Sequence, residues 1–360
     1  MRTYQTRYAT SAEDRSRQLR ELDAPLILAA NTTYRDTEFV VSPRFVGTSV
    51  RAALYGPAVA SGIQLRNCVV RTTYPTWDPA WATDLRLRIA GLRLDTPRRL
   101  AIDGFHVEGM PDAGLSVHGI ETAALLRISV TRCMVGANLG MTVAANRNVD
   151  VDGFRAWDTW GPPPGLIPGF GGAASNAHPG EYAGGDGFVA YLEDSTLRDL
   201  ACTGELYGAV KLVRSKRLKL DGLLAHSLMI QGTQARYANS DGSTDGSDDI
   251  EVRRLYLAKR LGHGAIAEAG NGLQISFNVR GLDVREFVLL GDGRNGHAIQ
   301  LWGDVEASFR GGIISGWNGT RGNAPAVALE TGDGSRENDD FETANVFYEQ
   351  ERLVLHRIAG

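Results

Sequence analysis

A short phrase of the form apolar–polar–glycine–apolar returns along the middle of the chain. It reads Ile102-Asp103-Gly104-Phe105, Val151-Asp152-Gly153-Phe154, Leu220-Asp221-Gly222-Leu223 and Val279-Arg280-Gly281-Leu282. The same frame without the glycine occurs at Leu197–Leu200 and Val252–Leu255. The step from Leu197 to Leu220 is 23 residues, and that from Val252 to Val279 is 27. A period in the twenties predicts one structural unit that is stacked on copies of itself.

Within each repeat, apolar and polar positions alternate over only a few residues, as at Leu85–Ile89 and Leu115–Val117. This pattern is typical of short β-strands, and the segments are too short for helices. A leucine-rich repeat would show a leucine/asparagine consensus, and a propeller would need a period of about forty residues. We therefore predict an all-β chain that folds as a single-domain parallel β-helix, a solenoid.

Three regions are expected along this solenoid. Residues 1–60 form an N-terminal cap, in which Ser11–Leu22 is interpreted as a short capping helix that ends before Pro25. Such a helix would cover the strand edges that a solenoid exposes at its end. Residues 61–330 form the coils of the parallel β-helix, and residues 331–360 form a C-terminal closing segment.

Two inserts interrupt the coils, at residues 158–186 and 233–249. The first is rich in proline and glycine but also carries aromatic side chains, which favours a lid or a cleft wall over a flexible spacer. The second is polar and acidic, and we expect it to be mobile or to bind cations weakly. The first insert is therefore the place at which a function is expected.

Composition narrows the classes of function. The chain has 360 residues and a formal net charge of −4, so no overall basic field indicates a nucleic-acid partner. No segment approaches the roughly 20 apolar residues of a membrane helix, and the N-terminus lacks the apolar core of a signal peptide. We expect a cytoplasmic protein without a membrane partner, as a monomer or a homo-oligomer.

Three cysteines are expected to be buried free thiols, namely Cys68, Cys133 and Cys202.

A β-helix has a filled interior, so a ligand site is expected on the outer face of a strand layer, walled by loops. Several polar and aromatic residues near the first insert are expected to face outward. The candidate catalytic residues are Arg155, Asp158, His178, Asp186, Lys211 and His226. The candidate substrate-binding residues are His106, His118, Trp157, Trp160, Phe170, Tyr182, Tyr191, Glu205, Gln231 and Tyr256.

Two reaction classes fit this mixture of side chains. A glycosidase needs two carboxyl groups at a set separation, which Glu205 or Asp186 with Asp158 would supply. A polyuronate lyase needs a base and a group that neutralises the substrate carboxylate, which Arg155, Lys211 and Asp152 would supply. No cofactor and no metal ligand are predicted, although a calcium ion on aspartates is an alternative way to neutralise that carboxylate.

Each candidate also has a purely structural interpretation. The aspartates before the repeated glycines fit Asx-type turns at the corners of the coils. Lys211 fits a solvated basic edge, and Arg155 fits simple stacking on Trp157. Only the convergence of several such groups around one insert favours a functional site.

The coil pattern from about Leu26 to Leu329 resembles the pectin-lyase-like superfamily of right-handed parallel β-helices, as does the opening at Leu26–Tyr34. The resemblance implies a right-handed coil and a carbohydrate-active enzyme, a polysaccharide or oligosaccharide lyase or a glycoside hydrolase. Its site would be a surface groove beside the first insert. Of the four polygalacturonase motifs, two have counterparts, at residues 248–249 and 262–264.

Two other functions stay open at this point. A small-molecule isomerase or cyclase of a biosynthetic pathway fits the missing signal peptide and the apolar insert. A phage tailspike-like module that binds glycans fits the solenoid. The expected partner is accordingly a glycan or a small-molecule substrate.

Overall fold

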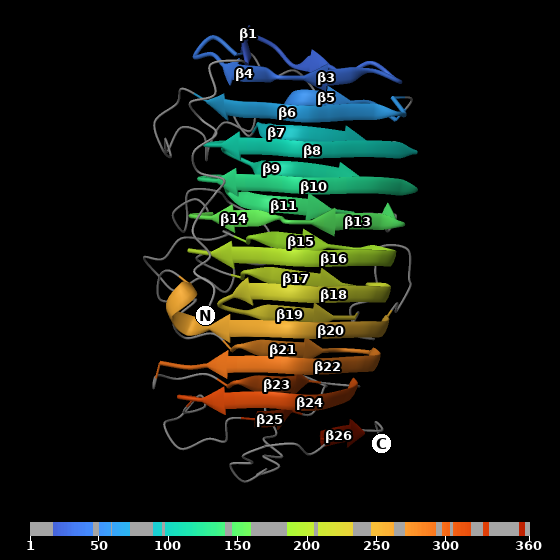
Figure 1. The fold of residues 1–360 in the computed structure, drawn as a ribbon, viewed down its shortest axis with the longest axis vertical. Helices are drawn as coiled ribbons and strands as arrows, with labels where there is room; N and C mark the ends of the chain where they lie inside the picture. Colours follow the sequence, from blue (N-terminus) through green and yellow to red (C-terminus); the bar gives the residue numbers. More distant parts are fainter. Residues whose placement is uncertain are drawn as a thin grey trace.

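The structure is a computed structural model. It describes residues 17–45, 50–58, 60–72, 89–95, 98–140, 146–159, 186–204, 208–232, 246–262, 271–292, 297–302, 305–317, 327–330 and 353–356. These ranges form a stack of coils that contains two long β-sheets (Figure 1).

Sheet A is the larger and has 15 strands. In chain order they are β1 (Gln18–Leu22), β3 (Thr33–Arg35), β4 (Thr37–Val41), β6 (Ile63–Thr72), β8 (Arg99–Glu108), β10 (Thr122–Thr131), β12 (Asn146–Arg147), β13 (Val149–Asp152), β14 (Arg155–Trp157), β16 (Leu192–Thr203), β18 (Lys216–Ala225), β20 (Ser247–Ala258), β22 (Val279–Leu290), β24 (Val305–Ser315) and β26 (Leu353–His356). The main path through the sheet is β1-β4-β6-β8-β10-β13-β16-β18-β20-β22-β24-β26.

Sheet B has 11 strands, which pair in chain order. They are β2 (Leu26–Ile27), β5 (Ala52–Gly56), β7 (Ala90–Asp95), β9 (Ala113–His118), β11 (Val135–Leu139), β15 (Phe188–Ala190), β17 (Val210–Val213), β19 (Leu228–Gln231), β21 (Leu273–Ser276), β23 (Ile299–Trp302) and β25 (Val327–Glu330). Within the described ranges, the one helical turn is the 3₁₀ turn η3 (Lys259–Leu261).

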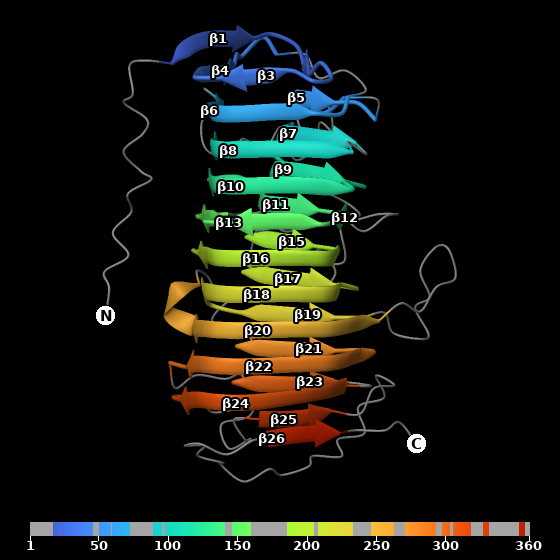
Figure 2. The same cartoon turned by 45° about the vertical axis from the view of Figure 1, so that its right-hand side comes forward.

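The chain alternates between the two sheets and descends one coil at a time. Among the described strands every pairing is parallel except that of β24 with β26. In Figure 1 the long strands of sheet A cross the front towards the left and the strands of sheet B cross behind towards the right, which makes the coil right-handed. Figure 2 shows β1 at one end of the stack and β26 at the other. The predicted right-handed parallel β-helix is confirmed.

The predicted capping helix is wrong where the structure describes it. Gln18–Leu22 is the strand β1, which pairs in parallel with β4, and residues 11–16 lie outside the described residues. Leu22 is buried whereas Leu19 is 66% exposed, so the two leucines do not share one apolar face. Pairing with the free edge of β4 satisfies the backbone groups of this segment, which is the stronger requirement at the end of a sheet.

The long strands of sheet A bend at one residue with a positive φ, and these residues lie side by side in successive coils. We call this column the corner stack. It consists of Asp36, Asn67, Gly104, Arg127, Gly153, Asp199, Gly222, Arg254, Glu286 and Gly311, with φ between 49° and 88°. Glycine and asparagine adopt this conformation at the lowest cost, so the repeated glycine is a backbone requirement of the corner.

One copy of the sequence phrase was assigned to the wrong corner. Gly281 lies beside Asp249, in a second column of positive-φ residues that precedes the corner stack along each strand. In the corner stack itself, the neighbour of Arg254 is Glu286. The structural repeat of Val252–Leu255 is therefore Val284–Phe287, not Val279–Leu282. The prediction failed because both corners select residues that tolerate a positive φ.

The aspartates that precede the repeated glycines do not show the predicted Asx-type bonds among the described interactions. Asp103 accepts a hydrogen bond from Arg127 Nε at 2.7 Å, and Asp221 pairs with Arg254. The Arg198 Nε and Asp152 Oδ2 atoms are 3.5 Å apart. Each pair connects one coil to the next on an exposed surface, where such a pair contributes about 0.2–1 kcal/mol.

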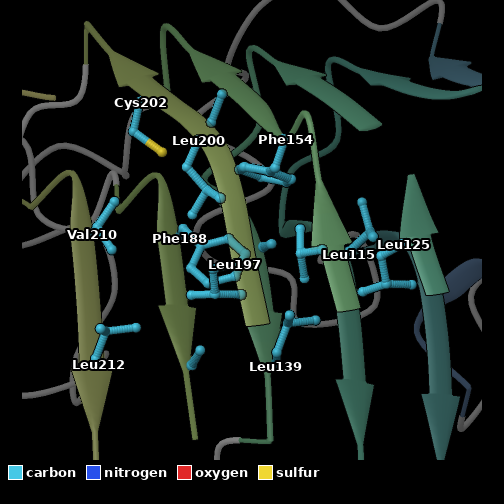
Figure 3. Close-up of a cluster of buried hydrophobic side chains, with 14 of the residues drawn as sticks. Leu115, Leu125, Leu139, Phe154, Phe188, Leu197, Leu200, Cys202, Val210 and Leu212 are labelled. Atoms are coloured by element: carbon cyan, nitrogen blue, oxygen red, sulfur yellow. The ribbon is translucent and has the colours of Figure 1, made fainter. Parts of the chain in front are cut away.

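Apolar side chains of equivalent positions stack in columns between the two sheets. One column contains Leu65, Ile102, Leu125, Val151, Leu197, Leu220, Val252, Val284 and Phe309, all of them buried. Figure 3 shows part of this core, in which Phe154 and Phe188 meet edge to face with ring centroids 5.0 Å apart. All three cysteines are free and buried, as predicted, and burial raises the pKa of Cys133 to about 12.

Candidate functional site

Beyond the corner stack, the outer face of sheet A carries two parallel columns of side chains. The first contains Val69, His106, Ser129, Arg155, Ala201, Leu224, Tyr256, Val288 and Ile313, and the second contains Arg71, Glu108, Thr131, Trp157 and Thr203. Neighbours in a column are one strand spacing apart, about 4.8 Å. Polar and charged groups concentrate in the strands from β6 to β14, so this part of the face is the candidate site.

Five side chains form the centre of this site: His106, Glu108, Ser129, Arg132 and Trp157, which we call the His106 cluster. The Nδ1 atom of His106 is 2.8 Å from Ser129 Oγ, and its Nε2 atom is 4.0 Å from Glu108 Oε2. The imidazole stacks on the indole of Trp157, with ring centroids 6.1 Å apart and an interplanar angle of 27°. The histidine is therefore contacted by the next two coils, through Ser129 on β10 and Trp157 on β14.

The surroundings of His106 favour its neutral form. Burial, together with the positive charges of Arg17 and Arg132, lowers the pKa of His106 to about 4, while a hydrogen bond to the backbone of Ser129 opposes the shift. At neutral pH the imidazole consequently carries one proton. If the Nδ1–H group donates to Ser129 Oγ, the lone pair of Nε2 is available to accept a proton.

One arginine–carboxylate pair lies within the cluster and a second one borders it. Arg132 pairs with Glu108, and Arg71 Nε is 2.5 Å from Glu38 Oε1. The arginine side chains are partly exposed. Because a guanidinium group has five N–H donors, it can bind a second carboxylate while it keeps the first.

Arg155 and Trp157 lie on β14, as the predicted outward positions require. Arg155 Nη1 donates to the backbone carbonyl of Phe154 at 2.8 Å and also to that of Asp199. Its guanidinium group therefore stabilises the corner of two coils. Asp158 follows at an exposed position with a φ of 54°.

Lys211 and Asp186 form an ion pair on the other sheet. Lys211 Nζ is 2.9 Å from Asp186 Oδ1 and 3.0 Å from Oδ2, and both side chains are largely buried. Lys211 belongs to β17 of sheet B, whereas Arg155 belongs to sheet A. The structure thus separates two of the predicted catalytic residues onto opposite faces of the solenoid.

The other described candidates are spread along the coils. His226 lies between β18 and β19 and is only 2% exposed, so the predicted outward position is wrong. Tyr191 lies under Arg214, whose guanidinium carbon is 4.5 Å from the ring centroid. Gln231 and Tyr256 are half-buried on β19 and β20. The remaining candidates lie outside the described residues, namely Trp160, Phe170, His178, Tyr182 and Glu205.

A second polar group lies on the outer face of sheet B, around His118. The Ser116 Oγ and His118 Nε2 atoms are 2.8 Å apart on β9. Asp95 on β7 lies opposite His118 in the strand register. Its carboxylate accepts hydrogen bonds from Tyr55 Oη at 3.0 Å and from Arg93 Nε at 3.2 Å.

The sequence did not identify Ser116, Ser129 or Arg132 as site residues. A serine at a strand position carries no sequence signal by itself, and Ser116 and Ser129 become informative only through the histidine that each one contacts. The spacing of Ser116 and His118, two residues apart on one strand, was a usable signal because such residues share a face.

The described ranges contain no group of three or more His, Cys, Asp or Glu side chains placed to hold a metal ion. Among the same residues there is no helix that is long and apolar enough to cross a membrane.

No family model matches the chain, and no curated protein sequence matches it. Among solved structures, the A-module of the mannuronan C-5 epimerase AlgE6 of Azotobacter vinelandii is similar, with 11% identity, a TM-score of 0.45 and coverage of 87% of this chain and 83% of that chain. The surface adhesin PfbA of Streptococcus pneumoniae has 8% identity, a TM-score of 0.47 and coverage of 87% and 84%. An endo-xylogalacturonan hydrolase of Aspergillus tubingensis has 13% identity, a TM-score of 0.36 and coverage of 88% and 80%.

Similarity at this level carries no argument about activity. The parallel β-helix, the architecture implied by the resemblance to the pectin-lyase-like superfamily, follows from the strand pairing itself.

Proposed function

We propose that the protein binds an acidic glycan on the outer face of sheet A and cleaves it as a polysaccharide or oligosaccharide lyase. The observation that carries the proposal is the position of the His106 imidazole, which contacts Ser129 and Trp157 beside the Glu108–Arg132 pair. A base that is unprotonated at neutral pH, an aromatic ring and an arginine are the three groups that this proposal assigns to a uronate residue.

Each group has a separate task in this proposal. The indole of Trp157 offers an apolar face to a sugar ring, and its N–H group can bond a hydroxyl. Arg132 binds the uronate carboxylate and withdraws charge from the neighbouring carbon. His106 Nε2 is the general base, because the neutral imidazole can accept a proton while the charged groups around it keep their charges.

The reaction is a β-elimination. His106 Nε2 takes the proton from C5 of the uronate, and the electrons of that C–H bond form the C4=C5 double bond. The C4–O4 bond breaks, and the departing O4 takes up the proton from the imidazolium. The products are an unsaturated uronate end and a new reducing end, and no external oxidant or reductant is needed.

The test is an assay on a panel of uronic-acid polysaccharides, in which product formation is monitored by the absorbance of the unsaturated uronate. We expect His106→Gln to lower kcat by about 10²- to 10⁴-fold, the usual contribution of a general base, with little change in glycan binding. Lys219→Ala, on the same sheet before the corner stack, is the control and should keep full activity.

The pH profile gives an independent readout. Because the pKa of His106 is lowered to about 4, the base is neutral and active above that pH. The rate should therefore fall only as the pH approaches about 4, not near 6.5, the usual pKa of histidine. A glycan that binds without forming unsaturated product, or an unchanged rate in His106→Gln, would contradict the proposal.

A further inference from the structure

We propose a second site, on the outer face of sheet B, at which Ser116 acts as a nucleophile towards carboxylic esters. The residues are Tyr55, Arg93, Asp95, Ser116 and His118, which we call the Ser116 cluster. They come from three successive strands, β5, β7 and β9, and they face away from sheet A and its His106 cluster.

The pair at the centre has the geometry of a nucleophile and its base. Ser116 Oγ lies 2.8 Å from His118 Nε2, within the range in which a hydroxyl proton is shared with an imidazole. Burial, together with the charge of Arg93, lowers the pKa of His118, although Asp95 acts in the opposite direction. The neutral ring is the form that can accept the proton of the serine.

Asp95 is placed to orient the base. It lies opposite His118 in the parallel register, one strand away, and its negative charge acts on the imidazole. The carboxylate is itself fixed by Tyr55 Oη and Arg93 Nε. A nucleophile, a base and a third group that holds the base are the parts from which catalytic triads are built, whatever the fold.

Arg93 supplies positive charge next to the nucleophile. It is the direct neighbour of Ser116 in the strand register, so its guanidinium group borders the same surface. The bond to Asp95 uses Nε, so the four N–H groups on the two Nη atoms are not engaged by that bond and can face a ligand. Such a group stabilises the oxyanion that forms when a serine attacks an ester carbonyl.

The other serine–histidine pair provides a contrast. Ser129 bonds to Nδ1 of His106 but is only 6% exposed, so its hydroxyl is closed to a substrate. Ser116 is half-buried on an outer face, and it contacts the distal ring nitrogen, Nε2. Of these two pairs among the described residues, the Ser116 pair is the one that combines access with the orientation that a nucleophile needs.

The proposed step balances without a co-reactant other than water. Ser116 Oγ forms a bond to the acyl carbon while its proton moves to His118 Nε2. The alcohol leaves with that proton, and an acyl-serine remains. Water then attacks the acyl carbon, His118 takes and returns a proton, and the carboxylic acid is released with free Ser116.

The experiment uses the full chain with a fluorophosphonate probe, which reacts with activated serines, and with p-nitrophenyl acetate as a simple ester. We expect mass spectrometry to find the probe on Ser116, and Ser116→Ala to lose labelling and at least 90% of ester hydrolysis. Ser308→Ala is the matched control, because Ser308 is a half-buried strand serine whose hydroxyl donates to Asp283 Oδ1 at 2.9 Å and so has a carboxylate partner.

Two further variants distinguish a loss of the proposed chemistry from a loss of folding. His118→Gln keeps a hydrogen-bonding group and should lose labelling, while its thermal unfolding stays that of the wild type. Asp95→Asn tests a positioning role and should move the pH dependence of hydrolysis, an effect that a merely structural residue would not produce. Absence of labelling in the folded wild type, or labelling that survives Ser116→Ala, overturns the proposal. Neither result depends on lyase activity at His106.

Discussion

A residue in the corner stack must adopt a backbone conformation that costs most L-amino acids about 1–2 kcal/mol. The chain meets this requirement in different ways, with glycine at Gly104 and Gly153, asparagine at Asn67, and arginine at Arg127 and elsewhere. An arginine at this corner has the unfavourable backbone conformation, but its side chain forms an ion pair with the previous coil, as Arg127 does with Asp103. The corner thus selects a conformation and not one residue type.

Gly104 allows this cost to be measured. A Cβ atom at this position would lie 3.6 Å from the nearest atoms, the backbone of Asn67, so there is room and only the φ of 70° opposes a side chain. We expect Gly104→Val to lower the free energy of unfolding by about 1–2 kcal/mol. Gly104→Asn should cost clearly less, because Asn67 already occupies the equivalent position one coil earlier. Chemical denaturation of both variants checks this, and equal losses would contradict it.

The individual site residues show how far a sequence can be read at this scale. Alternation placed His106, His118 and Trp157 on outer faces, and the structure agrees. It did not show which residue of another coil each would meet, because inserts change the length of the repeat from one coil to the next. Ser129 is 23 residues from His106, and only the strand register makes them neighbours.

At the scale of the element, each coil is stabilised by the apolar side chains that it stacks on its two neighbours. Strand alternation predicted this inward column well, since the same residues recur in the phrase that repeats along the chain. It failed where backbone pairing outweighs side-chain pattern. The segment expected as a helix became β1, and Asp248-Asp249, expected at the end of a loop, belong to β20.

Leu197 and Thr196 test the two faces of one strand. Leu197 is fully buried between Val151 and Leu220, whereas Thr196 is half-buried on the outer face of β16. We expect Leu197→Ala to lower the free energy of unfolding by about 2–5 kcal/mol, since it removes buried methyl groups and leaves a cavity. Thr196→Ala should change it by no more than about 0.5 kcal/mol. Denaturant titrations followed by circular dichroism compare the two, and similar losses would show that the inward column is not the source of stability.

At the scale of the whole molecule, the solenoid is a linear object with two ends and two outer faces. The His106 cluster lies on sheet A, which crosses the front in Figure 1, and the Ser116 cluster lies on sheet B behind it, so the two clusters belong to different strand layers. The fold itself was predictable, because one period and one alternation apply to all coils. The proposed sites were predictable only in part, because they depend on a few side chains in particular coils.

The C-terminal end of sheet A depends on β26. This strand covers the edge of β24, and Leu355 pairs with Ala307. We expect Leu355→Pro to remove a backbone donor, to lower the free energy of unfolding by about 1 kcal/mol and to free the edge of β24. Sedimentation velocity should then show association that grows with concentration. Leu355→Ser keeps the backbone donor and should remain at the oligomeric state of the wild type; association in both variants would point away from the edge.

The reversed direction of β26 has a geometric consequence for assembly. Every other strand of sheet A runs the same way, so a further coil on β24 would have to be parallel, and β26 occupies that position with the opposite polarity. Two copies of the chain therefore cannot join tail to head into one sheet of uniform polarity. Growth of sheet A by a further parallel strand is therefore blocked at β24.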